Sequence, residues 1–338
     1  MSTFIRRALF AAPVLAMLAC GDSGSGPATS GSPARVIALQ GATQIGVFGQ
    51  PASVVPTVLV TDAENRPLSG VTVVFAAAAG TGSISSTSAT TDSRGTATPG
   101  VWTLGSTFAP LVLTATVAGL PPVTFTAKAI APDAGVLAFN ITDPANDTLA
   151  PPSTTLPKAH DVLSLRGDFK RDSLILTLVL AAPSLGSVGG ASAVSGFIEL
   201  DTDESAATGA RAVSNTYGAT ATTLGIDYVI ILQGSVPSVA SLGNISTNAA
   251  IPIPVSYIGN TVVVRIPIQA LGNDDGRFAL VGVIGTQDRP TDFFPNSGST
   301  VVHLNGSLAA LPSPIAPARL PANPFVSERL AGWPTLSH

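Results

Sequence analysis

Residues 53–76 read SVVPTVLVTDAENRPLSGVTVVFA and hold the pattern that decides the fold. Two apolar runs, Ser53–Thr61 and Gly70–Ala76, are rich in Val and Thr, as β-strands are. The segment between them, Asp62–Ser69, contains Asp, Asn, Pro and Ser, which favour turns. The sequence therefore predicts two strands joined by a polar turn, and we expect the second strand to pair with the first.

The strand-and-turn pattern extends outward over residues 35–130. Further strands are expected at Leu111–Val117 and Val123–Ala127, and Thr91–Ala97 (TDSRGTA) reads as a turn followed by another strand. Asp92 fits a turn because its side chain can accept backbone hydrogen bonds, and Gly95 supplies a positive φ. A calcium role for Asp62 or Asp92 is the weaker alternative. About seven short strands in ~100 residues is the size of an immunoglobulin-like sandwich.

On these motifs, residues 35–130 resemble the bacterial Ig-like domains of the invasin/intimin type (group 1). The most specific match is the TDSRGTA motif at Thr91–Ala97 with the strand at Leu113–Val117 after it. The resemblance also covers Val58–Asp62, Arg66–Val71, Val73–Phe75 and Gly80–Ser83. It implies a rigid spacer or adhesion module that carries no chemistry of its own.

A second β-rich region, 136–311, comes after a short linker at 131–135. Its expected strands are Val136–Asn140, Asp161–Phe169, Ser173–Ala182, Gly196–Leu200, Ile226–Gln233, Ile251–Tyr257, Thr261–Ile268 and Phe278–Gly285. Short polar turns such as Gly167–Asp172 and Ile258–Asn260 join neighbouring strands, as antiparallel sheets require. The predicted fold class is all-β: an immunoglobulin-like sandwich followed by a larger, jelly-roll-like β-sandwich.

The second region also shows a looser resemblance. Asp143–Thr148, Ile198–Asp203 and Arg265–Ile268 occur in an order that is similar to β-sandwich modules appended to exported bacterial proteins. These modules include carbohydrate-binding and DOMON-like domains. The resemblance implies the sandwich architecture and nothing about particular site residues.

Composition agrees with strands and turns. The 338 residues include 33 Gly and 28 Pro, which are the poorest helix formers. Charged residues make up only 11%, and the net charge is −4. Because no basic stripe is available to neutralise phosphates, nucleic acid is excluded as an expected partner. With one cysteine, the chain cannot form an internal disulfide.

The N-terminus reads as an export signal over residues 1–19. Arg6 and Arg7 precede a continuous apolar run, Ala8–Ala19, which is too short for a membrane span of ~20 residues but fits a signal peptide. The junction MLACG at 17–21 resembles a bacterial lipobox, in which Cys20 carries the lipid, although Met17 replaces the commoner Leu. The alternative is an ordinary secretory signal with a coincidental cysteine.

The segments around the two β units complete the organisation. Residues 20–34 are rich in Gly and Ser and predict a flexible tether, while the Pro-rich tail at 312–338 is expected to be extended or disordered. We therefore expect an exported protein, lipid-anchored to the bacterial membrane at the outer membrane or cell surface. Each buried lipid methylene contributes about 0.8 kcal/mol, so several acyl chains hold a soluble domain firmly.

Acidic residues cluster in the expected loops and raise the question of calcium. They form the groups Asp143 and Asp147; Asp201, Asp203 and Glu204; Asp274 and Asp275; Asp288 and Asp292. Carboxylates in loops can supply the six to eight oxygen ligands of calcium. Asp201 and Asp203 are the best candidate ligands, although the segment does not continue as an EF-hand. The alternative interpretation, which we favour, is that these are solvated turn formers.

No catalytic set is recognisable, so we predict no enzyme, no catalytic residues and no cofactor other than the calcium alternative. Three histidines and one cysteine give no zinc pattern, and His160 beside Asp161 does not make a triad. We expect a non-catalytic envelope lipoprotein whose spacer presents a binding or adhesion domain to a protein or glycan surface ligand. The alternative is a calcium- or carbohydrate-binding module of a secreted system, and a jelly-roll hydrolase is a more distant third.

Overall fold

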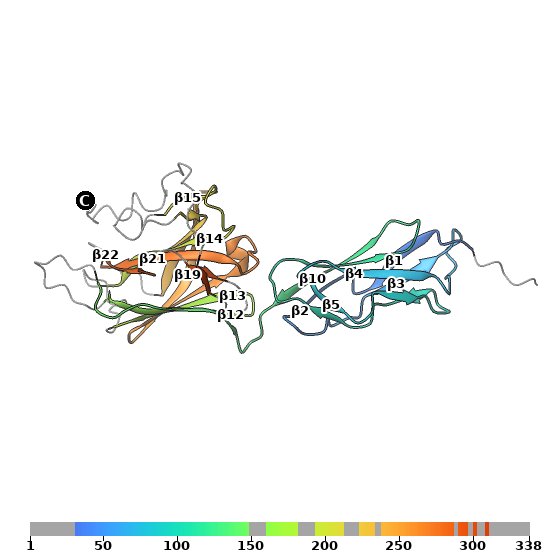
Figure 1. Cartoon of the computed structure of the whole chain (residues 1–338), viewed down its shortest axis with the longest axis horizontal. Coiled ribbons are helices and arrows are strands. Elements are labelled where there is room, and N and C mark those ends of the chain that lie inside the picture. The colour runs from blue at the N-terminus through green and yellow to red at the C-terminus, as the bar shows by residue number, and fades with distance from the viewer. Residues whose placement is uncertain are drawn as a thin grey trace, which may run out of the picture.

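Two β-rich units are arranged one after the other along the long axis of the molecule (Figure 1). The computed structural model describes residues 31–148, 160–181, 193–212, 223–233, 238–286, 290–296, 300–302 and 308–310. Within these residues the chain forms strands and one short 3-10 helix, η3 (Ile268–Leu271), so the predicted all-β class is confirmed. The described residues include no helix long and apolar enough to cross a membrane.

The first unit is a sandwich of two main sheets. One sheet has the strand order β1-β3-β7 and the other β2-β10-β9-β4-β6, while β5 and β8 pair separately. Alternate side chains of both sheets are buried between them, including Val58 of the first sheet and Phe75 and Phe125 of the second. The strands are β1 (Arg35–Gln40), β2 (Thr43–Val47), β3 (Thr57–Thr61), β4 (Thr72–Ala77), β5 (Gly82–Ile84), β6 (Ser88–Thr90), β7 (Thr96–Ala97), β8 (Trp102–Leu104), β9 (Leu111–Thr116) and β10 (Val123–Ile130).

The two runs of residues 53–76 form β3 and β4, but the expectation that they pair is wrong. β3 pairs with β1 and β7, whereas β4 pairs with β9 and β6 in the opposite sheet. The polar segment between them therefore crosses from one sheet to the other. Val58 and Val60 of β3 are fully buried, as are Val73 and Phe75 of β4, so the strands contribute to the core from different layers.

The expected turn chemistry of the first unit is confirmed. Asp92 Oδ1 accepts the backbone N–H groups of Arg94 and Thr96, both at 2.9 Å, and Gly95 has φ +73°. In the same way, Asp62 Oδ1 accepts the N–H of Arg66 at 2.8 Å. These carboxylates close their own loops, and this supports the turn interpretation over a calcium role.

The second unit is built on one long sheet that folds over itself. The order of its path is β11-β12-β13-β20-β19-β18-β17-β14-β21-β23-β24, with β22 also paired to β21. The strands are β11 (Val136–Thr142), β12 (Val162–Lys170), β13 (Ser173–Leu180), β14 (Ser195–Asp201), β17 (Tyr228–Leu232), β18 (Val239–Asn244), β19 (Ala249–Ile258), β20 (Thr261–Pro267), β21 (Phe278–Gly285), β22 (Pro290–Phe294), β23 (Thr300–Val302) and β24 (Leu308–Ala310). A separate pair is β15 (Ala210–Arg211) with β16 (Gly225–Ile226).

Strand β19 carries this sheet from one layer to the other. Its first part, Ala249–Pro254, pairs with β18, and its second part, Val255–Ile258, pairs with β20. On the opposite side, Asp292 Oδ2 of β22 accepts the backbone N–H of Val162 at 2.6 Å. The sandwich is thus joined by a continuous strand on one side and by a carboxylate on the other.

The two units meet through a chain of aromatic rings. Phe108 of the first unit lies 4.8 Å from Phe48 and 5.1 Å from Phe169 of the second unit, between ring centroids. Beside them, Ala131 donates its N–H to the carbonyl of Arg171 at 2.8 Å. The junction is therefore packed and hydrogen-bonded.

Candidate functional site

Two groups of carboxylates lie at opposite ends of the second unit. We define the proximal cluster as Asp201, Asp203 and Asp227, and the distal cluster as Asp143, Asp147 and Asp292; in each, the ligand atoms lie within 4.8 Å of one another. Asp201 pairs with Ala279 at the start of β21, whereas Asp292 pairs with Ile284 near its end. The proximal end is the one that faces the first unit, because Thr107 Oγ1 donates to the carbonyl of Asp275 at 3.3 Å.

The structure brings the predicted ligands Asp201 and Asp203 together in the proximal cluster. Asp201 is buried, and its two oxygens accept the N–H groups of Ser205 and Gly225, each at 3.1 Å. Asp203 Oδ2 accepts the hydroxyl of Thr208 at 2.8 Å. These hydrogen bonds brace the loop between β14 and β15, so the carboxylate oxygens already have protein donors.

Asp227 is a member of the proximal cluster that sequence reasoning missed. Its Oδ2 accepts both the N–H and the hydroxyl of Thr202 at 2.9 Å. It stands between β16 and β17, with Ile226 and Tyr228 buried on either side. Asp227 itself is half-buried, and an aspartate inside an otherwise apolar run is the signal that could have identified it, because a carboxylate among buried apolar neighbours needs partners.

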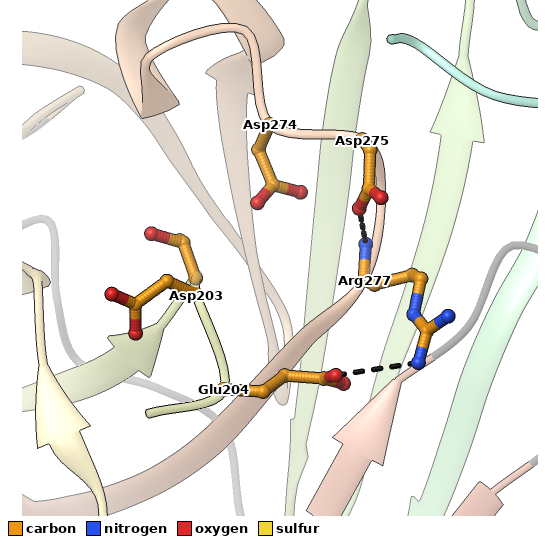
Figure 2. Close-up of a pocket in the computed structure, with 6 residues that line it drawn as sticks. Asp203, Glu204, Asp274, Asp275 and Arg277 are labelled. Atoms are coloured by element: carbon orange, nitrogen blue, oxygen red, sulfur yellow. Dashed lines mark hydrogen bonds and ion pairs between the residues drawn. The ribbon is translucent and has the colours of Figure 1, made fainter. Parts of the chain in front are cut away.

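An open pocket of about 410 Å³ adjoins this cluster (Figure 2). Its lining consists of Thr202, Asp203, Glu204, Asp274, Asp275 and Arg277. Arg277 Nη2 lies 3.3 Å from Glu204 Oε2, and burial raises the pKa of Asp274 to about 7. Burial also raises the pKa of Asp201 to about 7. The pocket can attract cations, and its arginine is already paired with a carboxylate.

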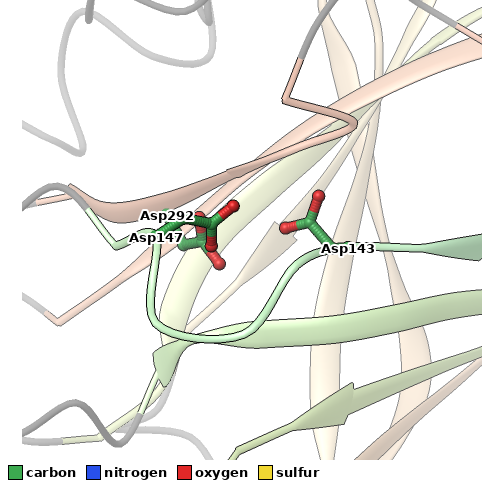
Figure 3. A group of neighbouring side chains, drawn as sticks. All are labelled: Asp143, Asp147 and Asp292. Atoms are coloured by element: carbon green, nitrogen blue, oxygen red, sulfur yellow. The ribbon is translucent and has the colours of Figure 1, made fainter.

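The distal cluster joins two distant parts of the chain (Figure 3). Asp143 and Asp147 belong to the loop that comes after β11, whereas Asp292 is the third residue of β22. Asp143 and Asp292 are buried, with 8% and 1% of their surfaces exposed. The prediction placed Asp292 in a loop; in the structure it points from a buried strand, next to Phe293 and Phe294.

Hydrogen bonds satisfy part of the distal cluster. Asp292 Oδ2 accepts the N–H of Val162, its Oδ1 accepts that of Phe293 at 2.9 Å, and Asn296 donates to Asp147. The buried Oδ2 of Asp143, in contrast, has no hydrogen-bond partner. Burial, together with the charges of neighbouring aspartates, raises the pKa of Asp143 to about 7, and burial likewise raises that of Asp292 to about 7.

Two aromatic rings that could stack on a sugar are buried. Trp102 is buried in the first unit, where its Nε1 donates to the carbonyl of Thr81 at 3.3 Å, and Tyr228 is also buried. Neither ring forms an exposed platform for a sugar. Cys20 lies outside the described residues, so its lipidation stays a prediction.

Comparisons with known proteins give neighbours in structure only. No family model and no curated protein matches this chain. Among solved structures, the Yersinia pseudotuberculosis adhesin InvE is 14% identical, with 79% of this chain and 57% of the adhesin covered and a TM-score of 0.27. The D0-D1 domain of intimin is 15% identical, with 69% and 98% covered and a TM-score of 0.24. This chain thus spans 57% of the adhesin's length.

Proposed function

We propose that this chain is a non-catalytic cell-envelope lipoprotein in which the Ig-like unit is a spacer and the second sandwich is a binding or adhesion domain. The observation that carries the proposal is the path of the chain through the first unit. Arg35 begins β1 beside Thr61, whereas Ile130 ends β10 beside Val47, at the other end of the sandwich. Because the chain enters and leaves this unit at opposite ends, the unit holds the tether and the second sandwich apart.

The packed junction supports the same proposal. A spacer presents its cargo in a fixed direction only if the joint between them is stiff. Phe108 fills that joint with 2% of its surface exposed, and Thr107 and Ala131 add hydrogen bonds across it. Figure 1 shows the second unit continuing the long axis of the first. The distal cluster therefore lies at the end of the molecule farthest from the tether.

Membrane attachment completes the proposal. Cys20 comes directly after an export signal and opens the Gly/Ser-rich segment 20–34, and it is the chain's one thiol. A lipid on Cys20 would hold the two units at the membrane, with the partner being a protein or glycan on a facing surface. The outer membrane or cell surface is the proposed location.

Intact-mass measurement of protein extracted from membranes tests the anchor. We expect a chain that begins at Cys20 and carries the added mass of a lipid, and we expect Cys20→Ser to move the protein out of the membrane fraction. A wild-type chain without added lipid mass, found equally in the soluble fraction, would refute the anchor. A matched control is Ser23→Ala, which changes the neighbouring tether and leaves the cysteine in place.

The alternative, a calcium- or carbohydrate-binding module, divides into two parts. The acidic clusters favour cations, whereas the burial of Trp102 and Tyr228 removes two of the aromatic rings that a sugar would stack on. Screening the mature chain against a glycan panel and against a panel of hydrolase substrates distinguishes the proposals. Turnover of any substrate that one point change abolishes would contradict a non-catalytic role.

A further inference from the structure

The distal cluster brings together acidic residues that the sequence placed in two separate groups, and their arrangement suits a cation. Carboxylate oxygens of Asp143, Asp147 and Asp292 lie within 4.8 Å of one another, and they come from two segments that are far apart in the chain. In Figure 3 the Asp143 carboxylate extends into the space beside the other two. Oxygens so arranged can all reach one ion, since calcium–oxygen distances are about 2.3–2.6 Å.

A second observation separates this cluster from an ordinary group of turn formers. Asp143 is 8% exposed, yet its buried Oδ2 has no hydrogen-bond partner, and the same holds for Oδ1 of Asp161, which is 1% exposed. A buried carboxylate oxygen without a donor costs free energy, so such atoms are rare unless a ligand meets them. Both oxygens of Asp201 in the proximal cluster have donors, as do both oxygens of Asp292 here, so the unpartnered oxygen of Asp143 is the feature that distinguishes the distal cluster.

The negative charges around the distal cluster also favour a bound cation. Asp161 is close enough to both Asp143 and Asp292 to interact with them electrostatically, so four carboxylates share this region. Each ion pair among the described residues uses other acids, at Asp62, Glu64, Asp133, Asp168, Asp172 and Glu204. Like charges in a buried region repel strongly, and a divalent cation reverses that repulsion.

We propose that the distal cluster binds a hard divalent cation, calcium in preference to magnesium, through Asp143, Asp147 and Asp292. Calcium is favoured because it accepts irregular arrangements of carboxylates, whereas magnesium demands a near-ideal octahedron. The bound ion joins the loop after β11 to strand β22. It thereby fastens the side of the sandwich that is otherwise joined by the 2.6 Å hydrogen bond from Val162 to Asp292 and by Thr291 Oγ1 donating to the carbonyl of His160.

Thermal unfolding of the full mature chain, stripped with EDTA and titrated with calcium chloride, tests the proposal. At calcium about 100-fold above Kd we expect Tm to rise by about 5–10 °C. Magnesium chloride at the same concentration should give a smaller rise. Isothermal titration of the same sample should show one site.

Asp143→Asn identifies the ligands, and Asp203→Asn is the matched control in the proximal cluster. We expect Asp143→Asn to weaken calcium binding at least ten-fold and Asp203→Asn to leave it unchanged. In EDTA, Asp143→Asn should unfold at the same temperature as wild type or higher, because it removes like-charge repulsion. A merely structural Asp143 would lower Tm equally with and without calcium, and that result overturns the proposal.

Two other results would also overturn it. One is the absence of any Tm shift or heat of binding at about 10 mM calcium, well above the roughly 1 mM of weak extracellular sites. The other is calcium binding that Asp203→Asn abolishes and Asp143→Asn leaves intact. The experiment is independent of the proposed function, because it works on protein purified from either the membrane or the soluble fraction.

Discussion

Replacing Phe108 by Ala tests whether the two units act as one body. The ring is 2% exposed and makes edge-on contacts with Phe48 at 4.8 Å and Phe169 at 5.1 Å. Burial of a Phe side chain contributes about 1.5–3 kcal/mol, and each aromatic pair adds about 0.5–1.5 kcal/mol. The expected loss of unfolding free energy is therefore about 3–5 kcal/mol, the range measured for buried Phe→Ala changes.

Guanidinium unfolding and small-angle X-ray scattering measure the two consequences. The variant should lose stability and also show a broader distribution of interatomic distances, because the joint between the units is no longer filled. Ile45→Ala is the control: Ile45 is 67% exposed on the first unit, and its loss should change stability by about 0.5 kcal/mol or less. If Phe108→Ala behaves like this control in both measurements, the argument for a stiff joint is wrong.

Two further predictions concern single residues. Chemical denaturation should show that Gly95→Ala loses at least twice as much unfolding free energy as Gly119→Ala. Both glycines have φ above +70°. An added Cβ at Gly95 would lie 2.7 Å from the carbonyl oxygen of Val60, whereas one at Gly119 would meet open space. Equal losses would refute the close approach. Burial raises the pKa of Asp274 in the folded state to about 7, whereas the unfolded value is near 3.9. Between about pH 4 and 7 the folded state therefore keeps a proton that the unfolded state releases. The free energy of unfolding falls as the pH rises through this range. Asp274→Asn should remove this fall and raise the stability at pH 8 by roughly 1–2 kcal/mol, after allowance for solvent screening. Both proteins are measured in EDTA, and an unchanged dependence of stability on pH in the variant would refute the prediction.

Strands with strong local signals were predictable. Ser173–Leu180 and Phe278–Gly285 are continuous apolar runs bounded by turn residues, and both form central strands. The strand Val239–Asn244 escaped prediction because Ala, Ser, Gly and Asn give it little β preference, although Ala240 and Leu242 are buried. β22 escaped because it begins with Pro290, which favours the edge of a sheet.

Long-range pairing explains the remaining differences. The turn residues at 62–69 fit both a hairpin and a crossing between sheets, so local chemistry could not decide which strand lies beside β3. The same limit hid the distal cluster. Asp143 and Asp292 are 149 positions apart, and only the closure of the sandwich brings them together. The turn roles of Asp62 and Asp92 were predictable because their partners lie within four residues.

Labelling an introduced thiol on intact cells tests the central claim most directly. Ile258 is 67% exposed in the β19–β20 hairpin. This hairpin lies at the distal end, because Asn260 accepts the N–H of Leu180. Leu180 pairs with Val162, whose own N–H binds Asp292 of the distal cluster. With Ile258→Cys, a membrane-impermeant maleimide should label the second unit, whereas wild type should stay unlabelled because a lipid occupies the sulfur of Cys20. Labelling of wild type, or labelling of Ile258→Cys only after lysis, would contradict a lipid-anchored spacer that presents this domain outward.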